Sequence, residues 1–308
     1  MTQNIKKFNN KYITSAGEQR AFIEMKELNF LWFNTGTLCN IQCKGCYMES
    51  SPTNDQLLYI DLNDVENYLL QIIKHKLPVR NIGFTGGEPF MNKDIIKILI
   101  TCLEQGFNVL VLTNAMQPLI NQSKNLHNLK KYKNLSFRVS LDHYSKIKHE
   151  NIRGQNTWEK TLEGINLLEN NNLSIKIASR FLWKDESEEE IRCGFKKLFK
   201  NIKVNINAHN KEELVLFPEM DFKYDVPEIT SSCWKKLNKD PNNIMCASSR
   251  MIVKRKSTKT TSIVPCTLLP YEISFELGPN LVDSQKKVYL NHVHCAKFCV
   301  LGGGNCKG

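Results

Sequence analysis

The strongest chemical signal in the sequence is a set of three cysteines close together. Residues 35–52, TGTLCNIQCKGCYMESSP, contain Cys39, Cys43 and Cys46 in a C-x3-C-x2-C spacing. Three thiolates can hold a 4Fe-4S cluster and leave its fourth iron open to another ligand. A structural zinc ion usually takes four protein ligands, so zinc here would need one more, and His75 is the nearest histidine. The spacing therefore predicts a cluster with an open iron.

The other cysteines fall into two classes. Cys102 and Cys193 each stand alone in a helical pattern and are expected to be ordinary packing. After residue 226 the chain carries six of its eleven cysteines. Grouped cysteines in a reducing compartment more often bind metal than form disulfides. A zinc site with help from His292 and His294 is one alternative for this region.

The elements that must position these residues alternate between strand and helix. Alternation of this kind predicts parallel strands joined by crossover helices, in an incomplete barrel or an open sheet. We expect strands at 28–34, 79–84, 107–112, 135–141, 173–181, 204–206 and 214–217, and helices at 62–76, 94–105, 117–131, 157–169 and 186–199. The pattern is shorter than the roughly 250 residues of a complete eight-unit barrel.

Several polar residues follow directly after a predicted strand. Ligands bind at the carboxyl ends of parallel strands, so these side chains should converge on one rim. The residues are Cys39, Glu88, Asn114, Asp142, Arg180 and Glu219.

The sequence resembles the radical S-adenosylmethionine (SAM) superfamily. Members place the three-cysteine loop after the first strand of a partial (β/α)6 TIM-like barrel and carry a GGEP motif after the second strand. Gly86, Gly87, Glu88 and Pro89 stand in that place, and Thr113-Asn114-Ala115 is close to the Thr-Asn-Gly of many members. The resemblance implies that the GGEP segment binds the methionine amino group of SAM.

Further cofactor contacts follow from the resemblance. Many members have an aromatic residue just before the third cysteine; Gly45 stands there in this chain, so the role against adenine passes to Tyr47 or is lost. The ends of the fourth and fifth strands touch the ribose and carboxylate of SAM in similar enzymes, which singles out Ser140 and Arg180. Asn114, in the Thr-Asn-Gly-like segment, is a further expected cofactor contact. An arginine fork can bond both oxygens of a carboxylate.

The C-terminal cysteines resemble the SPASM or shorter Twitch extension of these enzymes. The resemblance implies a second, auxiliary 4Fe-4S cluster on Cys246, Cys266, Cys295 and Cys299, with Cys306 as a reserve ligand. The expected domains are an N-terminal arm over 1–27, a radical SAM core over 28–225 and the cysteine-rich auxiliary domain over 226–308.

The implied chemistry is reductive cleavage of SAM to methionine and a 5′-deoxyadenosyl radical, which takes a hydrogen atom from the substrate. A one-electron donor such as flavodoxin or ferredoxin would supply the electron. We expect a peptide or small-molecule substrate and net oxidation, with Asp142, His143 and Glu219 as candidate proton donors or acceptors. The alternatives are an RNA- or nucleotide-modifying radical SAM enzyme and a non-catalytic iron–sulfur or zinc protein.

Composition excludes some further classes. The formal net charge is +11, but the only tight basic run is Lys254-Arg255-Lys256, so nucleic acid is not an expected partner. The sequence has no apolar run near the roughly 20 residues of a membrane helix and no secretory signal at its start. We therefore expect a cytoplasmic protein.

Overall fold

The fold is built on one open sheet of eight strands. A computed structural model describes residues 6–182, 185–218 and 225–303. The strand order is β7-β6-β5-β4-β3-β2-β8-β9, and every neighbouring pair is parallel except the antiparallel pair β8 and β9. The strands are β2 (Phe30–Asn34), β3 (Asn81–Thr85), β4 (Asn108–Thr113), β5 (Leu135–Ser140), β6 (Ser174–Phe181), β7 (Leu214–Pro218), β8 (Ser249–Lys254) and β9 (Thr261–Val264). The predicted α/β partial barrel is confirmed.

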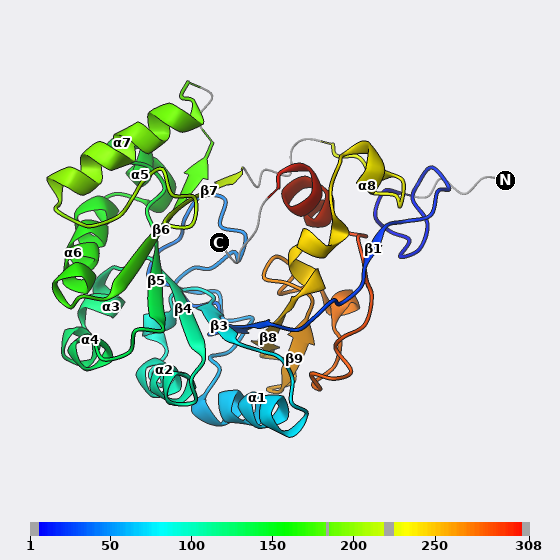
Figure 1. Cartoon of the computed structure of the whole chain (residues 1–308), viewed down its shortest axis with the longest axis horizontal. Helices are drawn as coiled ribbons and strands as arrows, with labels where there is room; N and C mark the ends of the chain where they lie inside the picture. The colour runs from blue at the N-terminus through cyan, green and yellow to red at the C-terminus, as the bar shows by residue number, and fades with distance from the viewer. Residues whose placement is uncertain (1–5, 183–184, 219–224, 304–308) are drawn as a thin grey trace.

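Helices cover the outer, convex side of the sheet (Figure 1). They are α1 (Leu62–Lys74), α2 (Ile95–Glu104), α3 (Gln117–Ile120), α4 (Ser123–Leu129), α5 (Lys146–Arg153), α6 (Thr157–Asn170) and α7 (Glu188–Asn201). Helix α1 shows why such segments fold: Asp61 and Asp64 form a capping box at its start, and Val65, Leu69 and Ile72 bury one stripe against the sheet. None of the helices in the described ranges is long and apolar enough to cross a membrane.

Two expected elements differ from the structure, and one helix was not expected. The helix expected over 117–131 is two helices, α3 and α4, with a break at Asn121, a residue type that favours turns over the helix interior. The segment 204–206 is not a strand, although Val204 and Ile206 are buried in the main core from a loop. Helix α5 was not predicted, because its pattern KIKHENIR has few apolar residues.

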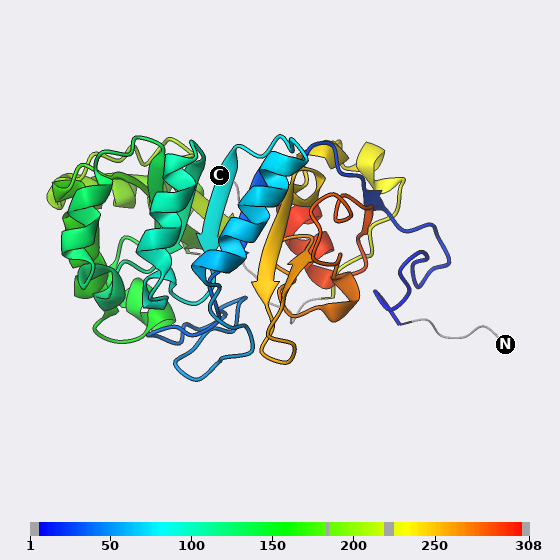
Figure 2. The same cartoon turned by 90° about the horizontal axis from the view of Figure 1, so that it is seen from below.

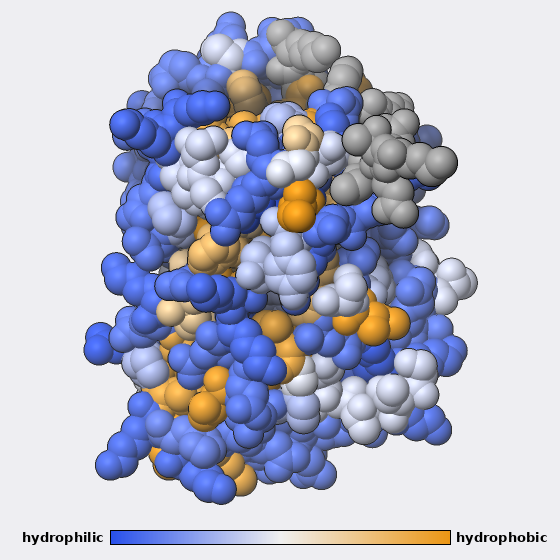
Figure 3. Space-filling view, turned by 90° about the vertical axis from the view of Figure 1, so that its right-hand side faces the viewer, coloured by the Kyte–Doolittle hydropathy of each residue, from blue (hydrophilic) through white to orange (hydrophobic). Residues whose placement is uncertain are grey.

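The C-terminal part packs on the sheet rather than standing apart from it. Strand β8 pairs with β2, and β1 (Phe22–Ile23) pairs with β10 (Val288–Tyr289). Figures 1 and 2 both show the blue N-terminal segment beside the yellow-to-red C-terminal part. A second hydrophobic cluster, separate from the core under the helices, joins Trp32 of the sheet to the C-terminal residues. The surface at this end is mainly hydrophilic with hydrophobic groups interspersed (Figure 3).

All three residues of the basic run at the end of β8, Lys254-Arg255-Lys256, form ion pairs. Lys254 contacts both Asp61 and Asp64 at the start of α1, at 2.8 and 2.6 Å. Arg255 pairs with Glu276, and Lys256 pairs with Asp55. These contacts neutralise the run and fasten the hairpin of β8 and β9 to the sheet and its first helix.

Candidate active site

The loop after β2 is held by backbone hydrogen bonds on both of its flanks. The N–H of Thr35 donates to the carbonyl of Thr85 at 2.7 Å, and the N–H of Cys39 donates to the carbonyl of Ser51 at 3.0 Å. Cys39 is buried, whereas Cys43 and Cys46 are half-buried. All three line a cavity of about 180 Å³ at the carboxyl ends of the strands.

These thiols fit an iron–sulfur cluster better than a single ion. Zinc–sulfur bonds of about 2.3 Å would bring tetrahedral sulfur ligands within about 3.8 Å of one another. No three cysteine sulfurs in the described ranges lie within 4.8 Å of one another, so the loop leaves room for a larger group. Burial raises the pKa of Cys39 to about 12 and also raises the pKa of Cys43. Thiolates in this loop therefore need bound cations, as a cluster supplies.

The two glycines of the GGEP segment allow it to lie directly on the cysteine loop. Gly86 has φ of +139°, and a Cβ there would lie 2.4 Å from the carbonyl oxygen of Gly36. A Cβ on Gly87 would lie 2.0 Å from the carbonyl oxygen of Leu38. Both glycines line the cavity. The absence of side chains at both glycines thus lets the backbone of the GGEP segment pack against the cysteine loop.

Glu88 is turned away from the cavity. Its side chain accepts hydrogen bonds from Thr113 Oγ1 and Asn114 N, both at 2.8 Å, and from Phe90 N at 3.1 Å. Burial raises its pKa to about 7. Neither Glu88 nor Pro89 is among the residues that line the cavity. Glu88 therefore joins the end of β3 to the end of β4, and its predicted cofactor contact stays a prediction.

The segment after β4 points an amide at the first cysteine. Asn114 Nδ2 lies 3.8 Å from Cys39 Sγ and donates to Asn40 Oδ1 at 2.8 Å. Ala115 follows with φ of +56°, a conformation that glycine adopts more easily. The glycine that many superfamily members have at this position thus has a backbone reason.

A buried carboxylate organises two arginines beside the loop. Asp142 lies 2.8 Å from Arg153 Nε and 3.3 Å from Arg180 Nε. Burial alone would raise the pKa of Asp142, but the two guanidinium groups outweigh it and lower that pKa. Asp142 is therefore ionised near neutral pH, and its predicted part in proton transfer stays a prediction.

Both arginines also touch the cysteine loop. Arg153 Nη1 lies 3.9 Å from Cys43 Sγ. Arg180 Nη1 donates to the carbonyls of Lys44 and Gly45 at 3.0 and 3.4 Å. A Cβ at Gly45 would lie 3.3 Å from the same Nη1. Arg180 therefore lies directly beside Gly45, the position at which many superfamily members have an aromatic residue.

His143 lies outside the cavity lining. Its Nδ1 accepts a hydrogen bond from Ser145 N at 2.9 Å, so Nε2 carries the proton and donates to Glu186 at 2.9 Å. Burial lowers the pKa of His143. Tyr47 and Ser140 line the cavity, and their predicted contacts with the cofactor stay predictions. Two predicted residues, Glu219 and the reserve ligand Cys306, fall outside the described residues.

The C-terminal cysteines form a different environment. Cys246, Cys266, Cys295 and Cys299 are all buried in the second hydrophobic cluster, and burial raises the pKa of Cys295 to about 12. None of the four lines the cavity, although Leu268 and Phe298, beside two of them, do. These two residues and Phe217, which stacks on Phe298 at 6.0 Å between ring centroids, form the wall on this side.

Two cavity arginines were missed by sequence analysis. Arg138 is 1% exposed on β5, and Arg153 closes the unpredicted helix α5. The charged Arg138 inside an apolar strand could have been identified as a candidate site residue, because arginine is rarely buried unless it is paired. No comparable signal marks Arg153, which depends on how α5 packs against the loop.

The family comparison agrees with this geometry. The family model described as "Radical SAM superfamily" matches residues 33–192, which is more than half of the chain. The chain belongs to the radical SAM superfamily. It is therefore an enzyme whose family implies a 4Fe-4S cluster and SAM as cofactors.

Similar proteins have diverse roles. The chain is 29% identical over 177 residues to molybdenum cofactor biosynthesis protein 1 of Drosophila melanogaster, covering 54% of this chain and 29% of that protein. It is 28% identical over 142 residues to the subtilosin biosynthesis protein AlbA of Bacillus subtilis, covering 46% and 30%. The chain thus spans about a third of each of these relatives.

Among solved structures, the fold matches Streptococcus suis SuiB. With SAM bound, SuiB aligns with a TM-score of 0.60 at 14% identity, covering 82% of this chain and 63% of SuiB. With its precursor peptide SuiA bound, the TM-score is 0.61 at 15% identity, covering 85% of this chain and 65% of SuiB. This likeness concerns the fold.

Proposed function

We propose that this enzyme cleaves SAM reductively at a cluster held by Cys39, Cys43 and Cys46 and oxidises a peptide substrate. The observation that carries the proposal is the pair of cysteine groups beside one cavity: three thiols lining it and four buried behind its apolar wall. In the proposal, Cys246, Cys266, Cys295 and Cys299 hold an auxiliary 4Fe-4S cluster. The enzyme works in the cytoplasm with a donor such as flavodoxin or ferredoxin.

Each cavity residue has a task in this scheme. The bound cluster and SAM supply the radical chemistry, and the protein supplies binding and orientation. Arg180 can donate hydrogen bonds to the SAM carboxylate while Asp142 orients its guanidinium group. Tyr47 and Ser140 are placed to contact the nucleoside. The wall of Phe217, Leu268 and Phe298 excludes water from the substrate side.

Two of the similar proteins favour a peptide substrate over a small molecule. SuiB was solved with a precursor peptide, and AlbA acts in the biosynthesis of a bacteriocin. The described C-terminal part contributes Leu268 and Phe298 to the cavity, an apolar side suited to a peptide side chain.

The test has two stages. The full chain, reconstituted anaerobically with iron and sulfide, should contain about eight irons and release 5′-deoxyadenosine with dithionite and SAM. A peptide encoded beside the gene should then lose hydrogens in a reaction that depends on SAM. No 5′-deoxyadenosine from the reconstituted chain would refute the proposal, and about four irons would refute the auxiliary cluster.

A nucleotide substrate is the second candidate. Three arginines, Arg138, Arg153 and Arg180, line the cavity against one carboxylate, Asp142, and this excess of positive charge suits phosphate groups. Assaying peptide and nucleoside triphosphates side by side for SAM-dependent consumption decides between the two classes.

A further inference from the structure

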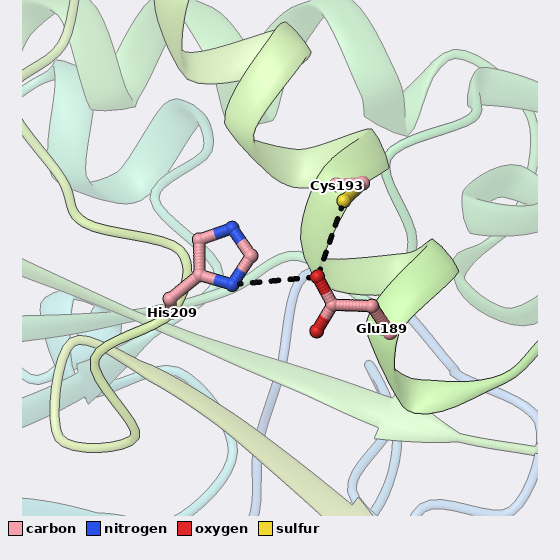
Figure 4. Close-up of side chains that lie close together, drawn as sticks. All are labelled: Glu189, Cys193 and His209. Carbon is pink, nitrogen blue, oxygen red and sulfur yellow. Dashed lines mark hydrogen bonds and ion pairs between the residues drawn. The ribbon is translucent and has the colours of Figure 1, made fainter.

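A second group of metal-ligating side chains lies away from the cavity, on α7 and the loop that leads into β7 (Figure 4). Glu189 and Cys193 are one turn apart on α7, and Cys193 Sγ lies 3.4 Å from Glu189 Oε1. His209 Nδ1 lies 3.8 Å from the same oxygen. In the described ranges, these three side chains form the one trio of His, Cys, Asp or Glu whose ligand atoms all lie within 4.8 Å of one another.

The expectation that Cys193 is ordinary packing is wrong. The residue is only half-buried, and its thiol faces Glu189 rather than the core that Ile191 and Phe195 of the same helix enter. Cys102, for which the same was expected, is fully buried in the main core. Cys193 is therefore accessible to solvent and to ions.

The loop that carries His209 is held in place independently of any ion. Arg192 Nη1 donates to the carbonyl of Ala208 at 2.7 Å. The side chain of Glu213 accepts from the N–H of Asn207 at 2.7 Å, and the His209 N–H donates to Asn207 Oδ1 at 3.0 Å. The backbone around the imidazole is therefore preorganised beside α7.

We propose that Glu189, Cys193 and His209 form a binding site for one zinc-type divalent ion. The donor set of one carboxylate oxygen, one sulfur and one imidazole nitrogen is typical of zinc. Bonds of about 2.0–2.3 Å in a tetrahedron place ligands about 3.3–3.8 Å apart, close to the two separations observed. Water takes the fourth position, and binding releases the thiol proton to solvent.

The site would join two parts of the barrel. Helix α7 supplies two ligands, and the third precedes β7, whose last residues Phe217 and Pro218 line the cavity. A bound ion would hold this strand against α7. The inference is independent of the substrate and of the auxiliary cluster.

Zinc K-edge absorption tests the site without interference from iron. The reconstituted full chain is equilibrated with zinc chloride and dialysed, and bound zinc is counted. We expect one zinc per chain with one sulfur at about 2.3 Å and oxygen or nitrogen at about 2.0 Å. Cys193→Ser and His209→Gln should each weaken binding at least tenfold, since even outer-shell changes cost 10–100-fold.

The matched control is His127→Gln, which changes an exposed histidine on α4. This variant should keep the zinc and the same absorption spectrum as the wild type. Equal zinc content in the wild type, Cys193→Ser and His209→Gln would mean an adventitious ion only and would overturn the proposal. Because the ligands lie at the surface, circular dichroism should show all variants folded.

Discussion

The two groups of cysteines differ in what surrounds them. Cys39, Cys43 and Cys46 lie on a loop, line the cavity and have an amide and an arginine within 4 Å of two of their sulfurs. The four C-terminal cysteines lie in a hydrophobic cluster, and none of them lines the cavity. One group thus faces the cavity, and the other is buried outside its lining.

This difference suggests different tasks. A cluster with three thiolates keeps an open iron for a ligand, whereas four buried thiolates can close a cluster completely. In our proposal the loop group therefore starts the chemistry, and the buried group accepts or relays an electron. Of the roles an auxiliary cluster can take, direct substrate binding fits the apolar wall least well.

The largest expected effect separates the two groups directly. Replacing Cys39, Cys43 and Cys46 together by alanine should reduce 5′-deoxyadenosine formation to background, because no cluster can bind SAM. Replacing Cys246 and Cys295 by alanine should lower the iron content from about eight to about four while SAM cleavage continues. Liquid chromatography of the nucleoside and iron analysis measure both. Loss of SAM cleavage in a folded C-terminal variant would break the proposed division of tasks.

A smaller effect is expected from the charge beside the loop. Arg153→Gln removes the guanidinium that lies 3.9 Å from Cys43 Sγ and pairs with Asp142. We expect SAM cleavage to slow by about 10–100-fold, as for other residues that orient metal ligands. The reduction potential of the loop cluster, followed by electron paramagnetic resonance, should become more negative. An unchanged potential would show that Arg153 only supports the fold.

An ion pair between the N-terminal arm and the C-terminal part stabilises the region that contains the four buried cysteines. Arg20 and Glu228 form an ion pair at 2.5 Å with side chains 0% and 4% exposed. Arg20→Ala leaves a buried carboxylate without its cation and should lower the free energy of unfolding by about 3–5 kcal/mol. Denaturant melts measure this change. The exposed pair of Lys287 and Glu24 is the control, and Lys287→Ala should leave stability nearly unchanged.

The stabilisation that Glu228 provides should also decrease at acid pH. Burial would raise the pKa of Glu228, but hydrogen bonds from Ser15, Phe8 and Arg20 outweigh it and lower that pKa to about 2. The folded state thus holds the carboxylate ionised where the unfolded chain takes up a proton. This stabilisation is complete above about pH 5 and is lost as pH falls from the ordinary value near 4.5 toward 2. Comparing the wild type with Glu228→Gln across this range should show the difference in stability shrinking.

The smallest effect concerns the backbone beside the first cysteine. Ala115 adopts φ of +56°, which costs an L-residue about 1–2 kcal/mol. Ala115→Gly relieves this strain. It also raises the conformational entropy of the unfolded chain, which lowers the free energy of unfolding by about 0.4–1 kcal/mol. The net gain in unfolding free energy should lie between about 0 and 1.6 kcal/mol, measured by urea melts. A loss of stability would mean that the alanine methyl group packs usefully.

Sequence patterns predicted the fold and the loop well because both depend on local periodicity and spacing. The strand–helix alternation and the three cysteines are of this kind. The hydrogen bonds of Glu88 could not be predicted from the GGEP motif, because its partners Thr113 and Asn114 come from another strand. Arg153 was missed for the same reason: its place beside Cys43 follows from tertiary packing of a weakly patterned helix.

The bond between Tyr271 and the cysteine loop has a consequence for engineering. The Tyr271 hydroxyl donates to the carbonyl of Met48 at 2.5 Å, and β8 lies hydrogen-bonded to β2 next to the start of that loop. The C-terminal part, which a domain exchange would remove, thus contacts the cysteine loop through Tyr271 and strand β2 through β8. Grafting a different C-terminal part onto this barrel would have to restore both the strand beside β2 and a donor for Met48.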